Sequence, residues 1–185
     1  MTGRPSLFSQ EELTALLAEL GERLARRGVR LSGYVVGGFA MTHEVSARRM
    51  TEDLDGLFAD YAVARAEAEA LARERGVSPS WFSDSASSFV EFDPADDIDA
   101  EEMTIGGARL RIASPRFLLA MKLAAGRAKD TGDLIALVRH LDLHDPERIV
   151  DIAFAIYGDD SVTLSDSRES VYYQAADLIR QAFQE

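Results

Sequence analysis

The order of hydrophobic periodicities along the chain is the feature that most restricts its fold. Before residue 113, short apolar runs typical of strands alternate with helical patterns, whereas after residue 114 every apolar pattern repeats at helical spacing. A doubly wound parallel sheet needs strands throughout, because each helix returns the chain to the sheet. We therefore expect an α+β protein, with a short mixed sheet flanked by helices and followed by a C-terminal helical part.

Two domain arrangements fit this pattern. Residues 1–113 are expected to form an α/β core and residues 114–185 a helical region packed on that core, either as a separate part or within one continuous domain. The length of 185 residues allows both, because a typical domain holds about 100–150 residues. With 46% apolar and 28% charged residues, the composition is that of a globular protein and excludes a wholly disordered or collagen-like chain.

Local signals place the individual elements. A serine at residue 9 predicts an N-capped first helix, and the Ser-Pro pair at residues 114 and 115 predicts another helix start. Gly106 and Gly107, between two apolar runs, indicate a two-residue hairpin turn. The expected strands cover residues 33–38, 53–58, 88–92, 102–105 and 108–112. The expected helices cover residues 10–27, 39–45, 61–75, 115–129, 130–140, 145–157 and 166–183.

Net charge and the lack of a long apolar segment restrict where the protein is expected to be located and which partners it is expected to bind. The formal charge is −12, which argues against general binding to nucleic acid or to an anionic membrane surface, since both need positive potential. The first residues lack the apolar core of a signal peptide, and no run approaches the ~20 apolar residues that span a bilayer. We expect a cytoplasmic protein with no membrane partner.

Residue usage excludes several chemistries. The chain has no cysteine, so it cannot form disulfides, thiolate metal sites or a cysteine nucleophile. Its three histidines, His43, His140 and His144, do not stand at ligand spacing on one face. We expect them to be structural or exposed.

Charge is unevenly distributed along the chain. Residues 84–102 hold eight acids and no base, and residues 103–129 hold six bases and no acid. Lys122 and Lys129, the only lysines, both lie in the basic segment. Because a lysine and an arginine are not interchangeable at a phosphate or catalytic position, this usage singles out the basic segment, with chance as the alternative explanation for two residues. The alternative is a solvated acidic loop beside an ordinary basic helix.

Asp53 and Asp55 flank Leu54 in one of the expected strands. Alternate side chains of a strand share a face, so the two carboxylates would project together while Leu54 enters the core. Adjacent carboxylates repel unless a cation lies between them, and Mg²⁺, which prefers oxygen ligands, suits this position. The alternative is that one aspartate forms a turn or pairs with Arg48 or Arg49.

A glycine pair precedes these aspartates. Gly37 and Gly38 end one strand and open a helix, which would let phosphate oxygens accept hydrogen bonds from the N–H groups at the helix start. The pattern is neither a P-loop nor a dinucleotide-binding fingerprint. A glycine pair on its own is also typical of a simple tight turn.

The strand, glycine pair and helix, followed by Arg49, Thr51, Asp53 and Asp55 in the spacing R-x-T-x-D-x-D, together resemble the nucleotidyltransferase superfamily related to DNA polymerase beta. The resemblance is closest to AbiE-type toxin nucleotidyltransferases and their uncharacterised bacterial relatives. A second block, KLAAGRAKDTGD at residues 122–133, is similar to a downstream motif of the same toxins.

The resemblance implies transfer of a nucleotidyl group from a nucleoside triphosphate (NTP), with Mg²⁺ or Mn²⁺ bound by Asp53 and Asp55. Gly37, Gly38 and Thr51 would then belong to the nucleotide-binding part of the site. Catalysis of this kind depends on positioning and on electrostatic stabilisation of phosphate charge.

The second block would complete the site. Lys122 would neutralise charge on the triphosphate, Arg49 and Arg127 would bind phosphate as bidentate forks, and Asp130 would be catalytic. From the residues alone, Lys122 could also be a surface lysine on an amphipathic helix. Asp130 could likewise be the N-cap of the next helix, with Asp133 three residues later favouring the helix start.

Two departures from the superfamily pattern concern the first motif and the third carboxylate. Many members carry Gly-Ser where this chain has Gly37 and Gly38. The third carboxylate is expected on a later strand, and Glu91, between two apolar residues, is the candidate metal ligand. If Glu91 does not serve, Asp130 takes that place.

Three functions fit these observations. The first is a Mg²⁺-dependent nucleotidyltransferase that modifies an RNA or protein acceptor, as one member of a toxin–antitoxin pair with a cognate protein partner. The second is an adenylyltransferase acting on a small molecule. The third is a non-catalytic member of the fold that binds a nucleotide or a partner. Apolar faces on the last helices would also permit a homodimer.

Overall fold

The protein is an α+β protein whose chain divides into two compact units. The computed structural model describes residues 7–46 and 50–183. The first unit takes in Met1–Ser87 and Asp99–Ala113, and the second takes in Ser88–Ile98 and Ser114–Glu185. Residues 88–98, which the sequence analysis placed in the α/β core, are thus grouped with the helical unit.

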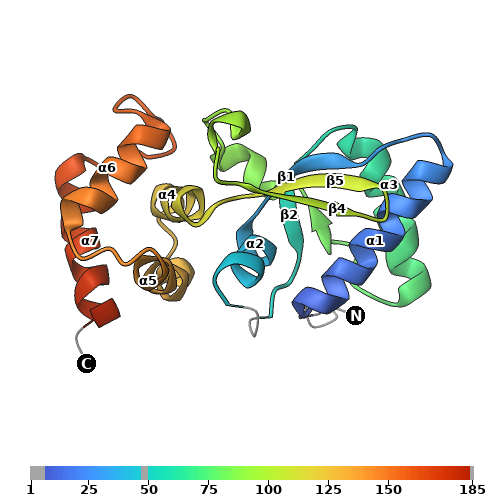
Figure 1. Cartoon of the computed structure of the whole chain (residues 1–185), viewed down its shortest axis with the longest axis horizontal. Coiled ribbons are helices and arrows are strands. Elements are labelled where there is room, and N and C mark those ends of the chain that lie inside the picture. The colour runs from blue at the N-terminus through green and yellow to red at the C-terminus, as the bar shows by residue number, and fades with distance from the viewer. Residues whose placement is uncertain (1–6, 47–49, 184–185) are drawn as a thin grey trace. The chain divides into compact units, whose positions relative to one another are not determined.

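The first unit is built on a five-stranded mixed sheet with the strand order β3-β2-β1-β5-β4 (Figure 1). Strand β1 pairs antiparallel with β2 and parallel with β5, while β4 pairs antiparallel with β5 and β3 parallel with β2. The strands are β1 (Ser32–Val36), β2 (Leu54–Phe58), β3 (Phe82–Ser83), β4 (Glu101–Ile105) and β5 (Ala108–Ile112).

The hairpin between β4 and β5 confirms the glycine-turn prediction. Gly106 and Gly107 have φ angles of 53° and 81°, a left-handed conformation that suits the tight turn of a two-residue hairpin. A β-carbon on Gly106 would also lie 2.0 Å from the carbonyl oxygen of Ala18. The turn therefore packs directly against the backbone of α1 (Gln10–Arg26).

Three helices accompany the sheet in the first unit: α1, α2 (Gly37–Glu44) and α3 (Tyr61–Arg75). A reciprocal capping box between Ser9 and Glu12 starts α1, as the serine predicted. Leu13, Leu17 and Leu20 of α1 are fully buried, since their spacing puts them on one face of the helix.

One predicted strand is wrong. Residues 88–92 form no strand; instead Ser85–Phe89 is a short 3₁₀ helix, and the chain beyond it is irregular. Serine side chains compete for nearby backbone groups and favour turns over strands, and this segment holds several of them.

The second unit contains four α-helices at the expected places. They are α4 (Pro115–Ala125), α5 (Thr131–His140), α6 (Pro146–Tyr157) and α7 (Arg168–Phe183). Helix α6 packs against α4 and α7, and α5 against α4 and α7. The buried Asp97 carboxylate accepts a hydrogen bond of 2.8 Å from the N–H of Ser114, which ties residues 88–98 to the start of α4. Within the described residues, every helix is too short or too polar to cross a bilayer.

Candidate functional site

The glycine turn and the second aspartate lie together at the paired ends of β1 and β2. Val36 of β1 lies opposite Asp55 of β2 in the antiparallel register, so Gly37, the next residue, lies close to Asp55. Gly37 has a φ of 66°, and a β-carbon there would lie 3.5 Å from the β-carbon of Asp55. Strand pairing therefore brings two motifs together that are far apart in the sequence.

Thr51 links the glycine turn to the aspartates. A β-carbon on Gly38 would lie 2.0 Å from the Thr51 hydroxyl oxygen, so the threonine side chain fills the space next to that glycine. Thr51 is nearly buried, and its backbone exchanges hydrogen bonds of 2.7 and 2.9 Å with Phe8. Its hydroxyl donates to the carbonyl oxygen of Asp53 at 3.2 Å. Thr51 thus positions the chain where it enters the aspartate motif.

Asp55 is held by hydrogen bonds from its own strand and from the 3₁₀ helix. Its Oδ1 accepts from the N–H groups of Gly56 at 3.0 Å and Ala86 at 3.2 Å, and its Oδ2 accepts from the Ser85 hydroxyl at 2.8 Å. An ionised carboxylate offers about four acceptor positions. These three bonds therefore orient the carboxylate and leave Oδ2 able to serve as a single metal ligand.

Burial agrees with the expected alternation around Leu54. Leu54 is fully buried, whereas Asp53 and Asp55 are both partly exposed. Asp53 lies immediately before β2.

Arg49, the expected phosphate fork, lies outside the described residues. On β3, the residue in register with Asp55 is Ser83, so that neighbouring position carries a hydroxyl and no carboxylate.

Lys122 lies in the second unit, in a buried network with two carboxylates. Its Nζ is 2.8 Å from Asp130 Oδ1 and 2.7 Å from Asp133 Oδ2, and all three side chains are less than a tenth exposed. Arg127 Nε donates to Asp130 Oδ2 at 2.6 Å. Burial raises the pKa of Asp130, but Lys122 and then Arg127 outweigh that effect and hold the pKa below its usual value. Lys122 is therefore a buried ion-pair residue and not a surface lysine.

Asp130 does not act as a helix cap. It occupies the residue before α5, as the sequence suggested, but its side chain makes no capping hydrogen bond. The carboxylate is instead engaged by Lys122 and Arg127. Local sequence could not show this, because the ion pair depends on how α4 and α5 pack.

Glu91 belongs to the second unit, apart from the unit that holds the paired aspartates. Its carboxylate accepts hydrogen bonds from the Ser161 hydroxyl and from the N–H of Thr163. The Ser161 hydrogen bond is the main reason that the pKa of Glu91 is lowered. Glu91 thus anchors the loop that follows α6, and it does not lie on a strand.

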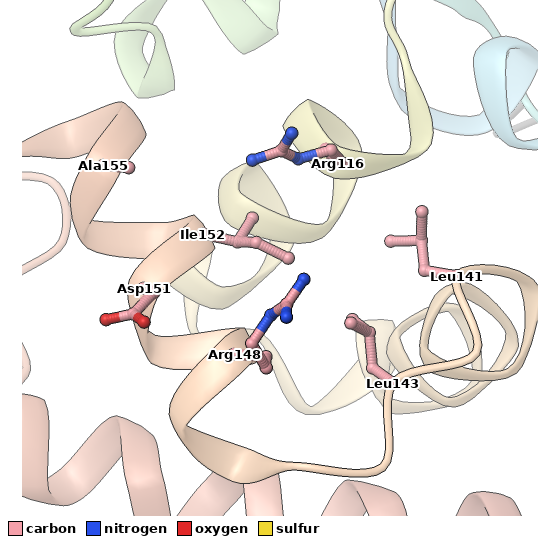
Figure 2. A pocket seen from close by; sticks show the side chains of 7 residues that line it. All are labelled: Arg116, Leu141, Leu143, Arg148, Asp151, Ile152 and Ala155. Carbon is pink, nitrogen blue, oxygen red and sulfur yellow. The ribbon is translucent and has the colours of Figure 1, made fainter.

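The sequence analysis missed a cavity of about 330 Å³ in the second unit (Figure 2). Arg116 on α4 and Arg148 on α6 both line it, and the guanidinium group of Arg148 lies between the apolar side chains of Ile152 and Leu143. Its residues come from separate segments, so only packing assembles the cavity. The basic segment had marked Arg116 but not Arg148.

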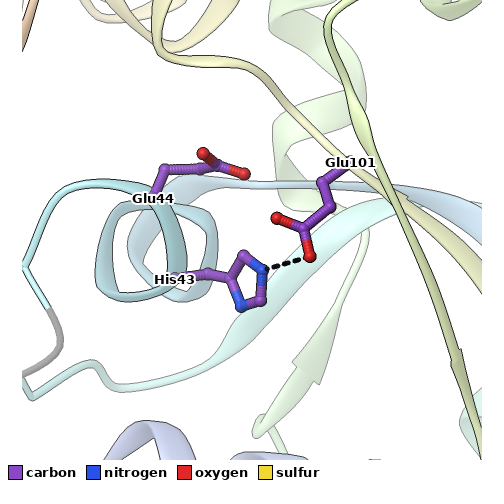
Figure 3. Close-up of side chains that lie close together, drawn as sticks. All are labelled: His43, Glu44 and Glu101. Atoms are coloured by element: carbon purple, nitrogen blue, oxygen red, sulfur yellow. Dashed lines mark ion pairs between the residues drawn. The ribbon is translucent and has the colours of Figure 1, made fainter.

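A second missed feature is a cluster of His43 and Glu44 on α2 with Glu101 on β4 (Figure 3). His43 Nε2 is 3.2 Å from a carboxylate oxygen of Glu101. The search for histidines at ligand spacing failed here because the partner carboxylate comes from another element, more than fifty residues later.

Comparisons of the chain with family models, with curated proteins and with solved structures found no match. Its function is therefore argued from the arrangement of its own residues.

Proposed function

We propose that the chain is a Mg²⁺-dependent nucleotidyltransferase that moves a nucleoside monophosphate from an NTP to an RNA or protein acceptor. The observation that carries this proposal is the closeness of Gly37 to Asp55, since a β-carbon on Gly37 would lie 3.5 Å from the β-carbon of Asp55. A left-handed glycine turn at the start of α2 therefore lies next to the second aspartate of the D-x-D motif. A phosphate-binding backbone and a metal-binding side chain would then act on the same triphosphate.

The donor set fits a hard divalent cation. Asp53 and Asp55 supply carboxylate oxygens, the ligand type that Mg²⁺ takes, and Asp55 keeps one acceptor position after its three hydrogen bonds. When bound, Mg²⁺ would neutralise triphosphate charge and favour in-line attack. Ser85 and Ala86 would hold the carboxylate in one orientation, so that little reorganisation accompanies the reaction.

The glycine turn would bind phosphate oxygens. Val36, the N-cap of α2, makes no side-chain capping bond, so the first N–H groups of the helix are not capped by that residue. The acceptor hydroxyl would attack the α-phosphorus, the bond to the bridging oxygen of pyrophosphate would break, and the hydroxyl proton would pass to solvent. The products are the modified acceptor and pyrophosphate.

The net charge limits how an RNA acceptor could be bound. The net charge of −12 is unfavourable for a broad nucleic-acid footprint, so an RNA acceptor would be held at one end only. A cytoplasmic protein working with a cognate antitoxin is the setting that the motif resemblance suggests.

A non-catalytic, nucleotide-binding role is the second candidate. Lys122 already has two carboxylate partners within 2.8 Å, which is the arrangement of a structural ion pair. In this case the aspartates would bind a metal–nucleotide complex without transfer.

The test is incubation of the purified protein with each labelled NTP, Mg²⁺ and cell lysate, followed by separation of RNA, protein and small molecules. Wild type should label one fraction, and Asp53→Asn and Asp55→Asn should abolish labelling while the protein stays folded. Glu52→Gln is the matched control, because Glu52 is an exposed carboxylate beside the motif. Equal labelling by wild type and both aspartate variants would refute transfer at this site. Mg²⁺-dependent NTP binding without labelling would favour the second candidate.

A further inference from the structure

We propose that His43, Glu44 and Glu101 form a site for a divalent transition-metal ion of the Zn²⁺ type, separate from the paired aspartates. The three residues come from the end of α2 and the start of β4, and each can offer one ligand atom, with all three atoms within 4.8 Å of one another. Figure 3 shows the three side chains around one common space.

The spacing of two ligands already matches a metal site. His43 Nε2 and Glu101 Oε1 are 3.2 Å apart. Ligand bonds to zinc of about 2.0–2.1 Å in tetrahedral geometry place neighbouring ligand atoms about 3.3 Å apart. A rotation of the Glu44 side chain, which lies at the helix end, would bring the third oxygen to the same separation.

Gln10 contacts the other nitrogen of the imidazole, since its amide Nε2 lies 3.1 Å from His43 Nδ1. An amide nitrogen donates, so in this arrangement Nδ1 accepts and Nε2 carries the proton that faces Glu101. Binding of an ion would release that proton from Nε2, and the amide would turn its oxygen to Nδ1, the contact that usually orients a metal-binding histidine. The Phe39 ring stacks on the imidazole at 6.4 Å, and only 16% of the His43 side chain is exposed. The ring is therefore held in one orientation before any ion binds.

Electrostatics at this place favour a cation. A divalent ion held by Glu44 and Glu101 would offset the negative charges of the two carboxylates. The C-terminal end of α2 also presents the negative end of its helix dipole, where a cation is stabilised.

The donor set selects the type of ion. One imidazole nitrogen with two carboxylate oxygens suits Zn²⁺ and its neighbours such as Co²⁺, whereas Mg²⁺ prefers oxygen ligands alone. Three protein ligands leave a fourth tetrahedral position for water. The site thus differs in chemistry from the oxygen-only pair of Asp53 and Asp55, so the two proposals can fail independently.

The test is calorimetric titration of untagged, chelator-treated protein with Zn²⁺ in the absence of nucleotide, with the visible spectrum of Co²⁺-loaded protein as the second readout. Wild type should bind one equivalent and give the absorption of tetrahedral Co²⁺. His43→Gln and Glu101→Gln should abolish that spectrum and weaken Zn²⁺ binding by at least tenfold. Gln10→Ala should weaken binding by about tenfold, as expected for an outer partner of the ligand.

The matched control is His144→Gln. His144 also contacts a carboxylate, that of Asp142 at 2.8 Å, but on the surface of the second unit, and it belongs to no cluster of three possible ligands among the described residues. This variant should bind Zn²⁺ as wild type does. Circular dichroism of each variant checks its fold, and Glu101→Gln affects a side chain that is 57% exposed. The proposal is overturned if wild type binds no Zn²⁺, if His43→Gln and Glu101→Gln bind it unchanged, or if only Asp55→Asn removes binding.

Discussion

The hydroxyl oxygen of Thr51 lies 2.0 Å from the position that a β-carbon on Gly38 would occupy. The two residues therefore share one space, and a side chain at residue 38 would not fit beside the threonine. Thr51 brings its hydroxyl to this place from the segment before β2.

Gly38→Ala should destabilise the first unit by about 1–3 kcal/mol, because the new methyl group must displace the Thr51 side chain. Urea denaturation measures the loss. Thr51→Ala in the same chain should recover part of it, since contacting substitutions are not additive. Gly132→Ala is the control, because a β-carbon there meets nothing within 4 Å and should cost no stability. If the stability losses of Gly38→Ala and Thr51→Ala simply add in the double variant, the explanation that the two side chains share one space is contradicted.

Asp55→Ala should lower the free energy of unfolding by about 1–3 kcal/mol even without metal, because the N–H of Ala86 and the hydroxyl of Ser85 lose a charged acceptor. Glu52→Ala, at an exposed position, should change it by less than about 0.5 kcal/mol. Chemical denaturation in the presence of a chelator separates this structural role from metal binding. Equal stability of the two variants would show that the 3₁₀ helix does not depend on Asp55.

Lys122→Met should destabilise the second unit by about 3–5 kcal/mol, because it leaves the buried carboxylates of Asp130 and Asp133 without their shared cation. Lys129→Met, at the only other lysine, is the matched control, since Lys129 is exposed and makes no such pair. Thermal unfolding of both variants measures the difference. A small effect at Lys122 would mean that the network adds little to the fold.

The pH dependence of this network has a definite sign. The pKa of Asp130 is lowered in the folded protein, so its contribution to stability is present above the unfolded pKa of about 3.9 and is lost as the pH falls through the folded pKa. As the pH is lowered from 4, Asp130→Asn should therefore lose less stability than wild type. Parallel acid-denaturation curves for the two proteins would contradict this.

Tyr157→Phe should cost about 0.5–1.5 kcal/mol, because the tyrosine hydroxyl donates a hydrogen bond of 2.6 Å to the carbonyl oxygen of Phe89. Burial and then the charge of Glu91 raise the pKa of Tyr157, so its contribution is complete below the unfolded pKa of about 10 and is lost as the pH rises through the folded value. Wild type should lose more stability than the variant in alkaline denaturation. Identical alkaline denaturation curves for wild type and Tyr157→Phe would show that the tyrosine hydroxyl makes no pH-dependent contribution to stability.

The sequence alone determined the order and type of nearly all the elements. Hydrophobic periodicity, the serine caps, the Gly106–Gly107 turn and the change to purely helical spacing after residue 114 are local signals, because each involves residues that are close together in the sequence. The strand predicted at residues 88–92 was wrong because an apolar pattern four or five residues long does not distinguish a strand from an irregular segment. Ser85, Ser87 and Ser88 favour turns over a strand in this part of the chain.

Tertiary structure alone decided what each candidate side chain contacts. From its sequence Lys122 could equally have been exposed or buried, and only the packing of Asp130 and of Asp133 on α5 places two carboxylates beside it. His43 acquired its carboxylate neighbour from β4, and Gly37 met Asp55 only through the register of β1 and β2. Side-chain partners of this kind depend on distances between segments far apart in the chain, and one-dimensional spacing does not encode those distances.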